Sequence, residues 1–105
     1  MRKAKVYRNR NFAGFLIEED NNYTFTYDDE YYLDNTQPSL SLTLPKSKKE
    51  YHSKYLFPFF FNMLSEGTNR KLQCRQLRID EKDHFGLLIK TATVDTIGPI
   101  SIKEA

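Results

Sequence analysis

Residues able to bind a metal or catalyse a reaction are sparse in this sequence. It holds one cysteine, Cys74, and two histidines, His52 and His84, and none of these has a second cysteine or histidine at zinc-ligand spacing. Cys74 lies among apolar neighbours, where an inert core thiol is expected, because a reactive thiol needs a lowered pKa. We therefore expect no metal site, no cofactor and no cysteine nucleophile.

Carboxylates gather at residues 18–20 and 28–30, on either side of a short aromatic run. Paired carboxylates can perform acid–base catalysis when burial raises the pKa of one of them. Both clusters lie beside turn-forming residues, so we expect them to be solvated. The four glycines do not form a phosphate-binding loop. The residue inventory thus predicts a protein that is not an enzyme.

Composition and charge narrow the class further. The length of 105 residues predicts a single domain over residues 1–105. The net charge of +2 favours binding to no particular polyanion. Because 14 acids offset 16 basic residues, we interpret the basic clusters as solvated faces and expect no direct nucleic-acid binding. No apolar run approaches the ~20 residues of a membrane span. The lack of a secretory signal and the single cysteine predict a cytoplasmic protein with no membrane partner.

The first part of the sequence has the pattern of β-strands. Residues 3–8, 12–19 and 23–27 are separated by two short turns rich in asparagine, which predicts an antiparallel meander. Residues 23–27 alternate aromatic residues with threonine, so one face of that strand is aromatic. Gly14 marks a bulge or a close backbone approach within the second strand.

The middle of the sequence predicts a helical turn at residues 31–33 and then a further strand. Residues 39–44 alternate serine or threonine with leucine, which predicts a half-buried strand that Pro45 ends. Residues 46–53 are polar and are expected to form a mobile loop.

The second half has the pattern of helices. A first, Phe-rich helix is predicted to begin at Pro58 and to end before Gly67, because Pro58 suits a first helical turn and Gly67 suits the position after a helix end. Apolar residues surround this helix on nearly all sides. Thr68 can cap a second helix that runs to about Leu77.

A third helix is predicted to follow Asp80 as its cap, with apolar residues at helical spacing from Phe85 to Ala92. Isoleucines around Gly98 and Pro99 indicate a final short strand. Strands followed by helices and a last strand predict an α+β domain, in which a small antiparallel sheet packs with about three helices.

Five segments, in order along nearly the whole chain, carry motifs: VY followed by FAGFL, SLSLTLP, FPFFFNMLSEG, DHFGLL and IGPISI, at residues 6–16, 39–45, 57–67, 83–88 and 97–102. Taken together, this ordered set resembles the N-terminal domain of HipA-type serine/threonine kinases. The corresponding signatures of that domain read LSLSLP, PFFxNLLPEG, DPFxLL and GAL.V.

In a complete HipA-type kinase, the phosphate-binding loop and the catalytic and metal-binding aspartates follow this domain, whereas the present sequence ends at Ala105. The resemblance therefore implies a free-standing domain, as in three-gene toxin–antitoxin modules of the HipBST type. It implies a HipS-like antitoxin that binds and neutralises a HipT-like kinase toxin. A HipB-like DNA-binding protein is the further partner that such a module implies.

We expect the kinase to contact the Phe-rich helix and the turn after it, because buried aromatics within a polar rim are typical of binding hot spots. Core is the default role of the other apolar side chains of this helix: Phe57, Phe60, Phe61 and Leu64. The predicted partner-binding residues are Phe59, Met63, Ser65, Glu66, Gly67, Thr68, Asn69 and Arg70.

Two alternatives remain open at this point. The chain can instead complete a split kinase as a regulatory subunit and so permit its activity. It can also bind nucleic acid in its own right, in which case added salt would weaken the affinity steeply.

Overall fold

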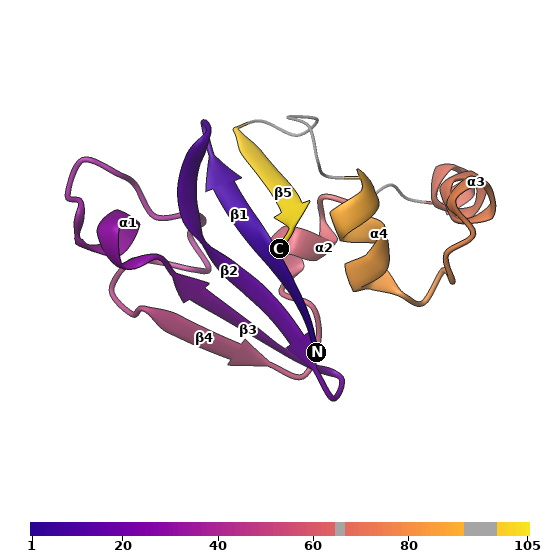
Figure 1. The fold of residues 1–105 in the computed structure, drawn as a ribbon, viewed down its shortest axis with the longest axis horizontal. Helices are drawn as coiled ribbons and strands as arrows, with labels where there is room; N and C mark the ends of the chain where they lie inside the picture. The colour runs from indigo at the N-terminus through magenta and orange to yellow at the C-terminus, as the bar shows by residue number, and fades with distance from the viewer. Residues whose placement is uncertain (65–66, 92–98) are drawn as a thin grey trace.

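The computed structural model describes residues 1–64, 67–91 and 99–105, and for residues 67–69 it describes only the backbone. Its centre is an antiparallel five-stranded sheet in the order β4-β3-β2-β1-β5 (Figure 1). The strands are β1 (Arg2–Arg8), β2 (Asn11–Glu19), β3 (Asn22–Tyr27), β4 (Glu50–Ser53) and β5 (Ile100–Glu104). The predicted meander and the predicted final strand are thus confirmed.

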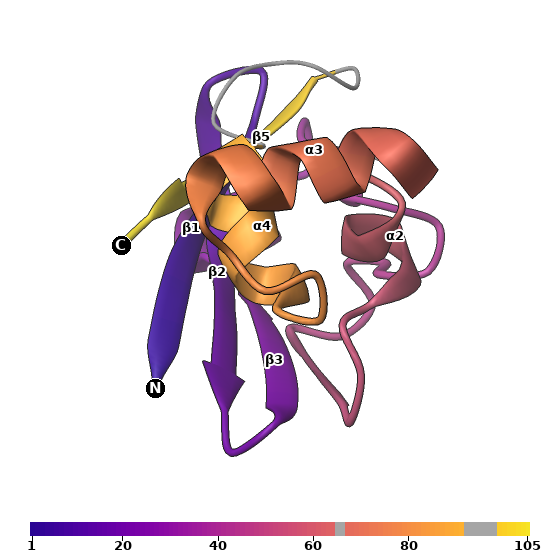
Figure 2. The same cartoon turned by 90° about the vertical axis from the view of Figure 1, so that its right-hand side faces the viewer.

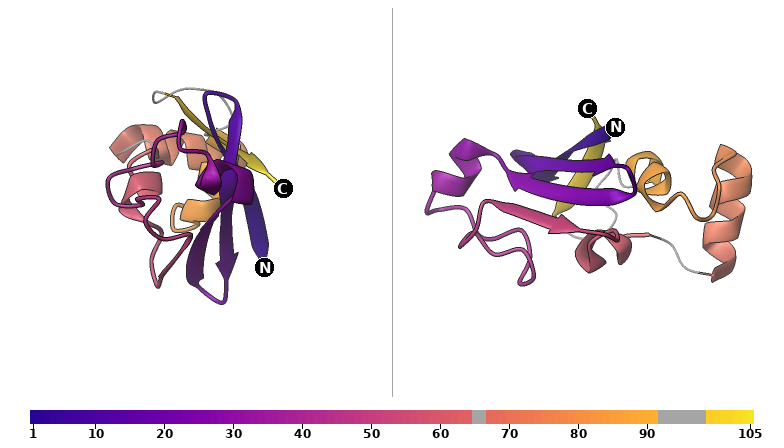
Figure 3. Two further views of the ribbon diagram at one scale, coloured as in Figure 1. Left: turned by 90° about the vertical axis from the view of Figure 1, so that its left-hand side faces the viewer. Right: turned by 90° about the horizontal axis from the view of Figure 1, so that it is seen from below.

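Four helices accompany the sheet in the described part of the chain: α1 (Asp29–Leu33), α2 (Pro58–Phe61), α3 (Gly67–Leu77) and α4 (His84–Thr91). Figure 2 shows α2, α3 and α4 in front of the sheet, and Figure 3 places α3 beyond α4, furthest from the strands. α1 lies at the opposite end of the sheet (Figure 1). The predicted α+β class is therefore correct. None of the helices among the described residues is long and apolar enough to cross a bilayer.

Asparagine and aspartate make the two tight turns of the meander. Asn9 and Arg10 have positive φ angles of 51° and 70°, and Asp20 and Asn21 have 51° and 62°. Two consecutive residues at positive φ form the hairpin turn whose twist matches that of the flanking strands, and Asn and Asp tolerate this conformation. The short turns therefore fix the pairing of β1 with β2 and of β2 with β3.

Gly14 is the point of close approach that the sequence predicts. A Cβ atom placed there would lie 2.2 Å from the carbonyl oxygen of Thr26, on the neighbouring strand β3. The β1–β2 register also shifts next to this residue, between Val6 and Tyr7. Only glycine lets β2 and β3 pair at their observed separation.

The core lies between the sheet and the helices. Val6, Leu16 and Phe25 contribute from three neighbouring strands, and Phe60 and Phe85 contribute from α2 and α4. All five side chains are fully buried. Phe25 and Tyr27 are buried as the aromatic face of β3, so the period-two prediction for this strand is confirmed.

Residues 39–44 do not form the strand that their alternation predicts. Leu40 and Leu44 are buried while Leu42 is 99% exposed, so the three leucines do not share one face and the segment is a loop. The hydroxyl of Tyr27 accepts a hydrogen bond from the Leu40 backbone N–H (2.9 Å) and donates one to the Leu44 carbonyl. These hydrogen bonds satisfy the loop backbone without a ladder partner.

Two further tyrosines hold the ends of this loop. The hydroxyl of Tyr31 donates to the Pro38 carbonyl (2.7 Å), and that of Tyr51 donates to the Pro45 carbonyl (2.6 Å). Tyr51 belongs to β4, which pairs with β3 inside the segment predicted to be a mobile loop. That prediction is wrong for residues 50–53, because a polar edge strand needs only one apolar face and one paired neighbour.

The Phe-rich helix is shorter than predicted. α2 ends at Phe61, after which Met63 and Leu64 donate backbone hydrogen bonds to the carbonyls three residues before them (3.1 Å each). This tight turn buries Met63 and Leu64. The prediction that Gly67 ends the helix is wrong, because Gly67 is the first residue of α3.

α3 ends at Leu77, as predicted, and it does so without a glycine. Arg78 has a φ of 57°, and the backbone N–H of Ile79 donates to the carbonyl of Cys74 (2.9 Å). This six-residue closure is a Schellman motif, whose left-handed position glycine fills most often. Ile79 packs against the same core that buries Cys74.

Asp83, and not Asp80 as predicted, caps α4. The Oδ1 atom of Asp83 accepts a hydrogen bond from the Gly86 backbone N–H (3.1 Å), as an N-cap side chain does. The Oδ1 atom of Asp80 instead accepts from the Lys82 N–H (2.9 Å) in the preceding turn.

An ionic cluster joins this cap to the sheet. The Arg2 guanidinium donates to Glu18 on β2 (2.8 Å) and to Asp83 (2.7 Å), and it lies 5.0 Å from the ring centroid of Phe85. Glu18 is therefore paired and half-buried, so the prediction of a fully solvated cluster at residues 18–20 is wrong for this residue. Strand pairing brings Glu18 opposite Arg2, which the sequence alone does not indicate.

The hydrogen bond from Arg2 lowers the pKa of Asp83 below its ordinary value of 3.8. A carboxyl with a lower pKa in the folded state adds stability above its unfolded pKa, and this contribution is lost as the pH falls through the folded value. We expect acidification below about pH 4 to reduce the free energy of unfolding less in Asp83→Asn than in the unmodified chain. Urea titrations at pH 6 and pH 3 measure this. Equal losses of the free energy of unfolding in both proteins would contradict a lowered pKa of Asp83 in the folded state.

Candidate functional site

The first residues of α2 set the directions of its phenylalanines. Phe57 precedes the helix, and its carbonyl accepts backbone hydrogen bonds from Phe60 and Phe61 (2.9 Å each). Pro58 occupies the first helical turn, where its missing N–H costs no hydrogen bond. Phe59 and Phe61 are two positions apart, and about 200° of helical rotation separates them. The phenylalanines of this short helix therefore point in different directions.

The phenylalanines divide between core and surface. Phe57 and Phe60 are buried, as predicted, and Phe60 packs 5.8 Å from the ring centroid of Phe25. Phe61 is only half-buried, and its ring meets that of His84 on α4 edge-on at 5.1 Å. Phe59 is half-buried too, with its ring edge-on to that of Phe60 at 5.2 Å.

Phe59 opens onto an apolar groove of about 350 Å³ between α2, the loop at residues 39–45 and the start of β5. We refer to it as the α2 groove. Its lining residues are Arg8, Ser39, Leu40, Phe59, Asn62, Met63, Pro99 and Ile100. Two of the predicted partner-binding residues, Phe59 and Met63, thus line one hollow. The loop that contributes Leu40 is the one fixed by the Tyr27 hydroxyl.

Arg70 lies elsewhere. Its guanidinium is 5.2 Å from the ring centroid of Phe61, on the side of α2 that meets α4. Arg70 is half-buried there and does not line the α2 groove. The structure thus separates the predicted surface into the α2 groove and a contact around Phe61 and Arg70.

The remaining predicted residues lie in and next to the segment that joins α2 to α3. Ser65 and Glu66 are outside the described residues. Gly67, Thr68 and Asn69 form the first turn of α3, and their backbone alone is described. The partner-binding role of the whole set stays a prediction.

Arg8, Leu40, Pro99 and Ile100 line the α2 groove but were not among the predicted site residues. They come from β1, a loop and the start of β5, which the fold brings together from distant parts of the chain. One signal was available in the sequence. Arg8 falls in phase with the apolar positions Ala4 and Val6, so it shares their face of the strand.

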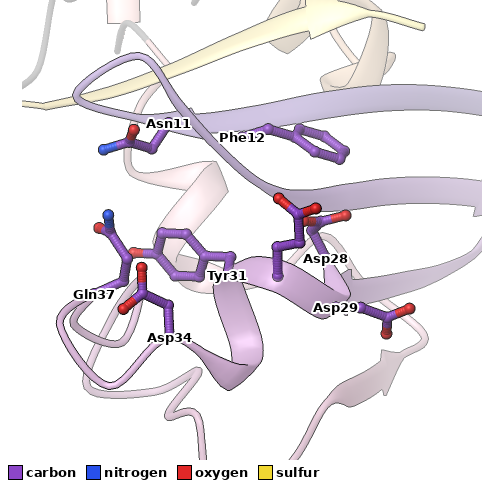
Figure 4. Close-up of a pocket in the computed structure, with 8 residues that line it drawn as sticks. Asn11, Phe12, Asp28, Asp29, Tyr31, Asp34 and Gln37 are labelled. Atoms are coloured by element: carbon purple, nitrogen blue, oxygen red, sulfur yellow. The ribbon is translucent and has the colours of Figure 1, made fainter.

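A second hollow of about 490 Å³ lies by α1, and its lining includes all three residues of the second acidic cluster (Figure 4). Figure 4 shows Asp34 and Gln37 beside the Tyr31 ring, while Asp29 points away from it. Asp29 and Glu30 are exposed, in agreement with the prediction of solvated acids. Hydrogen bonds from Thr36 lower the pKa of Asp34, which is the reverse of what a general acid needs.

The candidate nucleophile and metal ligands remain separate. Cys74 is buried in α3, and burial raises the pKa of its thiol, so the prediction of a core thiol is confirmed. Among the described residues, no three His, Cys, Asp or Glu side chains converge as a metal site would require.

A family model and a solved structure identify the family. A family model described as the HipA N-terminal domain matches residues 4–103. A solved structure described as the N-terminal domain of HipA toxin has a TM-score of 0.75 and 27% sequence identity, covering 100% of this chain and 93% of that chain. A protein of Haemophilus influenzae (strain Rd), described as uncharacterized, is 31% identical over 104 residues, which is 99% of this chain and 93% of that protein.

These matches are to the N-terminal domain and not to the catalytic part of the kinases. The family match covers β2, β3 and β4 completely and most of β1 and β5, and it includes the groove-lining segments of β1, α2 and β5. The chain belongs to the HipA N-terminal domain family.

Proposed function

We propose that this chain is a non-catalytic antitoxin that binds and neutralises a HipA-like (HipT) serine/threonine kinase toxin in the cytoplasm. Membership of the HipA N-terminal domain family supports a role with such kinases. The observation that carries a binding role is the α2 groove, a hollow lined by Phe59 and Met63 in which Arg8 is the one cation among the described lining residues. A HipB-like DNA-binding protein is the further partner of the proposed module.

The composition of the groove suits protein recognition. Aromatic, methionine and arginine side chains are enriched at protein interfaces, where a few anchors in desolvated pockets carry most of the binding free energy. Phe59 rests on Phe60, and Phe60 rests on Phe25, so the groove floor is continuous with the core. Such a floor is ordered before binding, which reduces the entropy lost on association.

Calorimetric titration of the partner kinase with this chain tests the proposal. We expect Phe59→Ala combined with Met63→Ala to weaken binding by at least ~2 kcal/mol, about 30-fold in Kd. Leu33→Ala is the matched control, because Leu33 is 75% exposed at the far end of the sheet on α1. Unchanged affinity in the double variant would remove the groove from the interface.

Co-expression with the kinase determines the sign of the effect. Restored growth of cells that carry the kinase is expected for an antitoxin. Toxicity that requires this chain would instead identify a subunit that completes a split kinase. Circular dichroism of each variant confirms that the fold is retained before binding is compared.

A further inference from the structure

Arg8 is a cationic residue on the core face of the sheet, and it lines the α2 groove. Side chains on β1 alternate, and Ala4 and Val6 face inward and are fully buried. Arg8 is next in that inward row, and its register partner on β5 is the buried Ile100. A row of buried apolar side chains therefore ends in a guanidinium.

Arg8 is half-buried, and none of the residues that the structure describes forms a hydrogen bond or an ion pair with its guanidinium. By contrast, Arg2 at the start of the same strand is bound by two carboxylates. A partly desolvated cation is costly unless it is paired, and a carboxylate is the pairing group with matching geometry. Arg8 is thus available to a carboxylate from outside the described residues.

The rest of the α2 groove has the opposite character. Leu40, Phe59 and Met63 line it with leucine, aromatic and thioether surface, beside Pro99 and Ile100. Its volume of about 350 Å³ lies at the low end for ligand pockets, which matches one or two side chains better than a large cofactor. The groove therefore places an apolar binding surface, the seat formed by Leu40, Phe59 and Met63, next to the cationic Arg8.

We propose that the α2 groove binds a segment of the kinase partner in which a large apolar side chain has a carboxylate within two residues of it. The apolar side chain occupies the seat formed by Leu40, Phe59 and Met63, and the carboxylate pairs with Arg8. This inference rests on the proposed function and adds the chemistry of the recognised segment. The charge of Arg8 makes the groove select a carboxylate over a carboxamide, because a neutral carboxamide cannot form a bidentate ion pair with the guanidinium.

Two blocked tripeptides test the chemistry directly. Acetyl-Leu-Asp-Leu-amide and acetyl-Leu-Asn-Leu-amide differ only in charge, and each is titrated into the isotope-labelled full chain while amide shifts are followed by NMR. We expect saturable shifts at Leu40, Met63 and Ile100, with the Asp peptide at least ~5-fold tighter. Arg8→Gln should abolish the difference between the peptides. Equal binding of both peptides, or no saturable shift at the groove, would overturn the proposal.

The kinase complex provides the second test. We expect Arg8→Glu to weaken the affinity of the full chain for the kinase at least ~10-fold, and Arg8→Gln to weaken it less. Unchanged affinity in Arg8→Glu would overturn this inference and leave the proposed function standing, whereas no kinase binding by the unmodified chain would overturn the proposed function. A dimer of this chain that the Asp peptide dissociates would show that a second copy occupies the groove, and would also overturn it.

Discussion

Replacing Gly14 with alanine is expected to lower the free energy of unfolding by about 3 kcal/mol, the upper end for overpacking a rigid site. The added methyl group would lie 2.2 Å from the Thr26 carbonyl oxygen and 3.0 Å from the Tyr27 Cα. Both are backbone atoms of β3, so no side-chain rotation can relieve the clash. The strands must separate, and backbone hydrogen bonds between β2 and β3 are then lost.

Gly86→Ala is the matched control for that substitution. Its new methyl would meet the Oδ2 atom of Asp83 at 2.3 Å, and this side chain can move away by loosening its hydrogen bonds with Arg2 and the Gly86 N–H, without separating two strands. Alanine also gains about 1 kcal/mol of helix propensity over glycine within α4. We expect urea denaturation to show a much smaller loss for Gly86→Ala. A Gly14→Ala protein as stable as the Gly86→Ala protein would contradict the close approach.

Phe60→Ala is expected to destabilise the fold by about 3–5 kcal/mol, because it removes a large ring from the centre of the core. Phe60 is 0% exposed and links α2 to the sheet through Phe25. A typical domain has only about 5–15 kcal/mol of stability, so this variant can approach complete unfolding. Phe60→Leu retains apolar volume and should fold with a smaller loss, which keeps the comparison measurable.

Phe59→Ala provides the contrast, since the adjacent ring is half-buried and lines the α2 groove. We expect thermal and urea unfolding to change less in Phe59→Ala than in Phe60→Leu, while kinase binding weakens more. The reverse ranking would place Phe59 in the core and Phe60 at the surface. The two neighbouring rings thus separate the stability of the domain from its proposed recognition.

A partner protein can reach some phenylalanines of α2 and its first flanking residue more easily than others. Phe57 and Phe60 are buried, and Phe61 is engaged with His84 and Arg70. Phe59 remains on the groove side, next to Met63. The groove also includes Arg8, so recognition would combine apolar contact with charge selection.

Several features follow from the sequence alone. Alternation in residues 23–27 predicted an aromatic face, and the asparagine-rich turns predicted the meander, because strand period and positive φ are local properties. The apolar spacing after Phe85 predicted α4 for the same reason. The ordered motifs also identified the family resemblance, which the family match over residues 4–103 supports.

Local pattern failed where distant groups supply the hydrogen bonds. The leucine alternation of residues 39–44 predicts a strand. The Tyr27 hydroxyl, 13 residues before Leu40, instead binds the Leu40 backbone N–H and holds the segment as a loop. Asp80 and Asp83 are equally good caps by residue type. Arg2, 81 residues before Asp83, binds the latter where it caps α4.

By itself, the sequence determined the strand meander, the α+β class and the family, because these depend on residue periodicity and on ordered motifs. Only the tertiary structure decided which residues join Phe59 and Met63 in the candidate site. It placed Arg8, Leu40, Phe59, Met63 and Ile100 around one groove, although they belong to four separate segments of the chain. The physical reason is that a groove is formed by side chains that strand pairing and helix packing bring together, and no local pattern records that meeting.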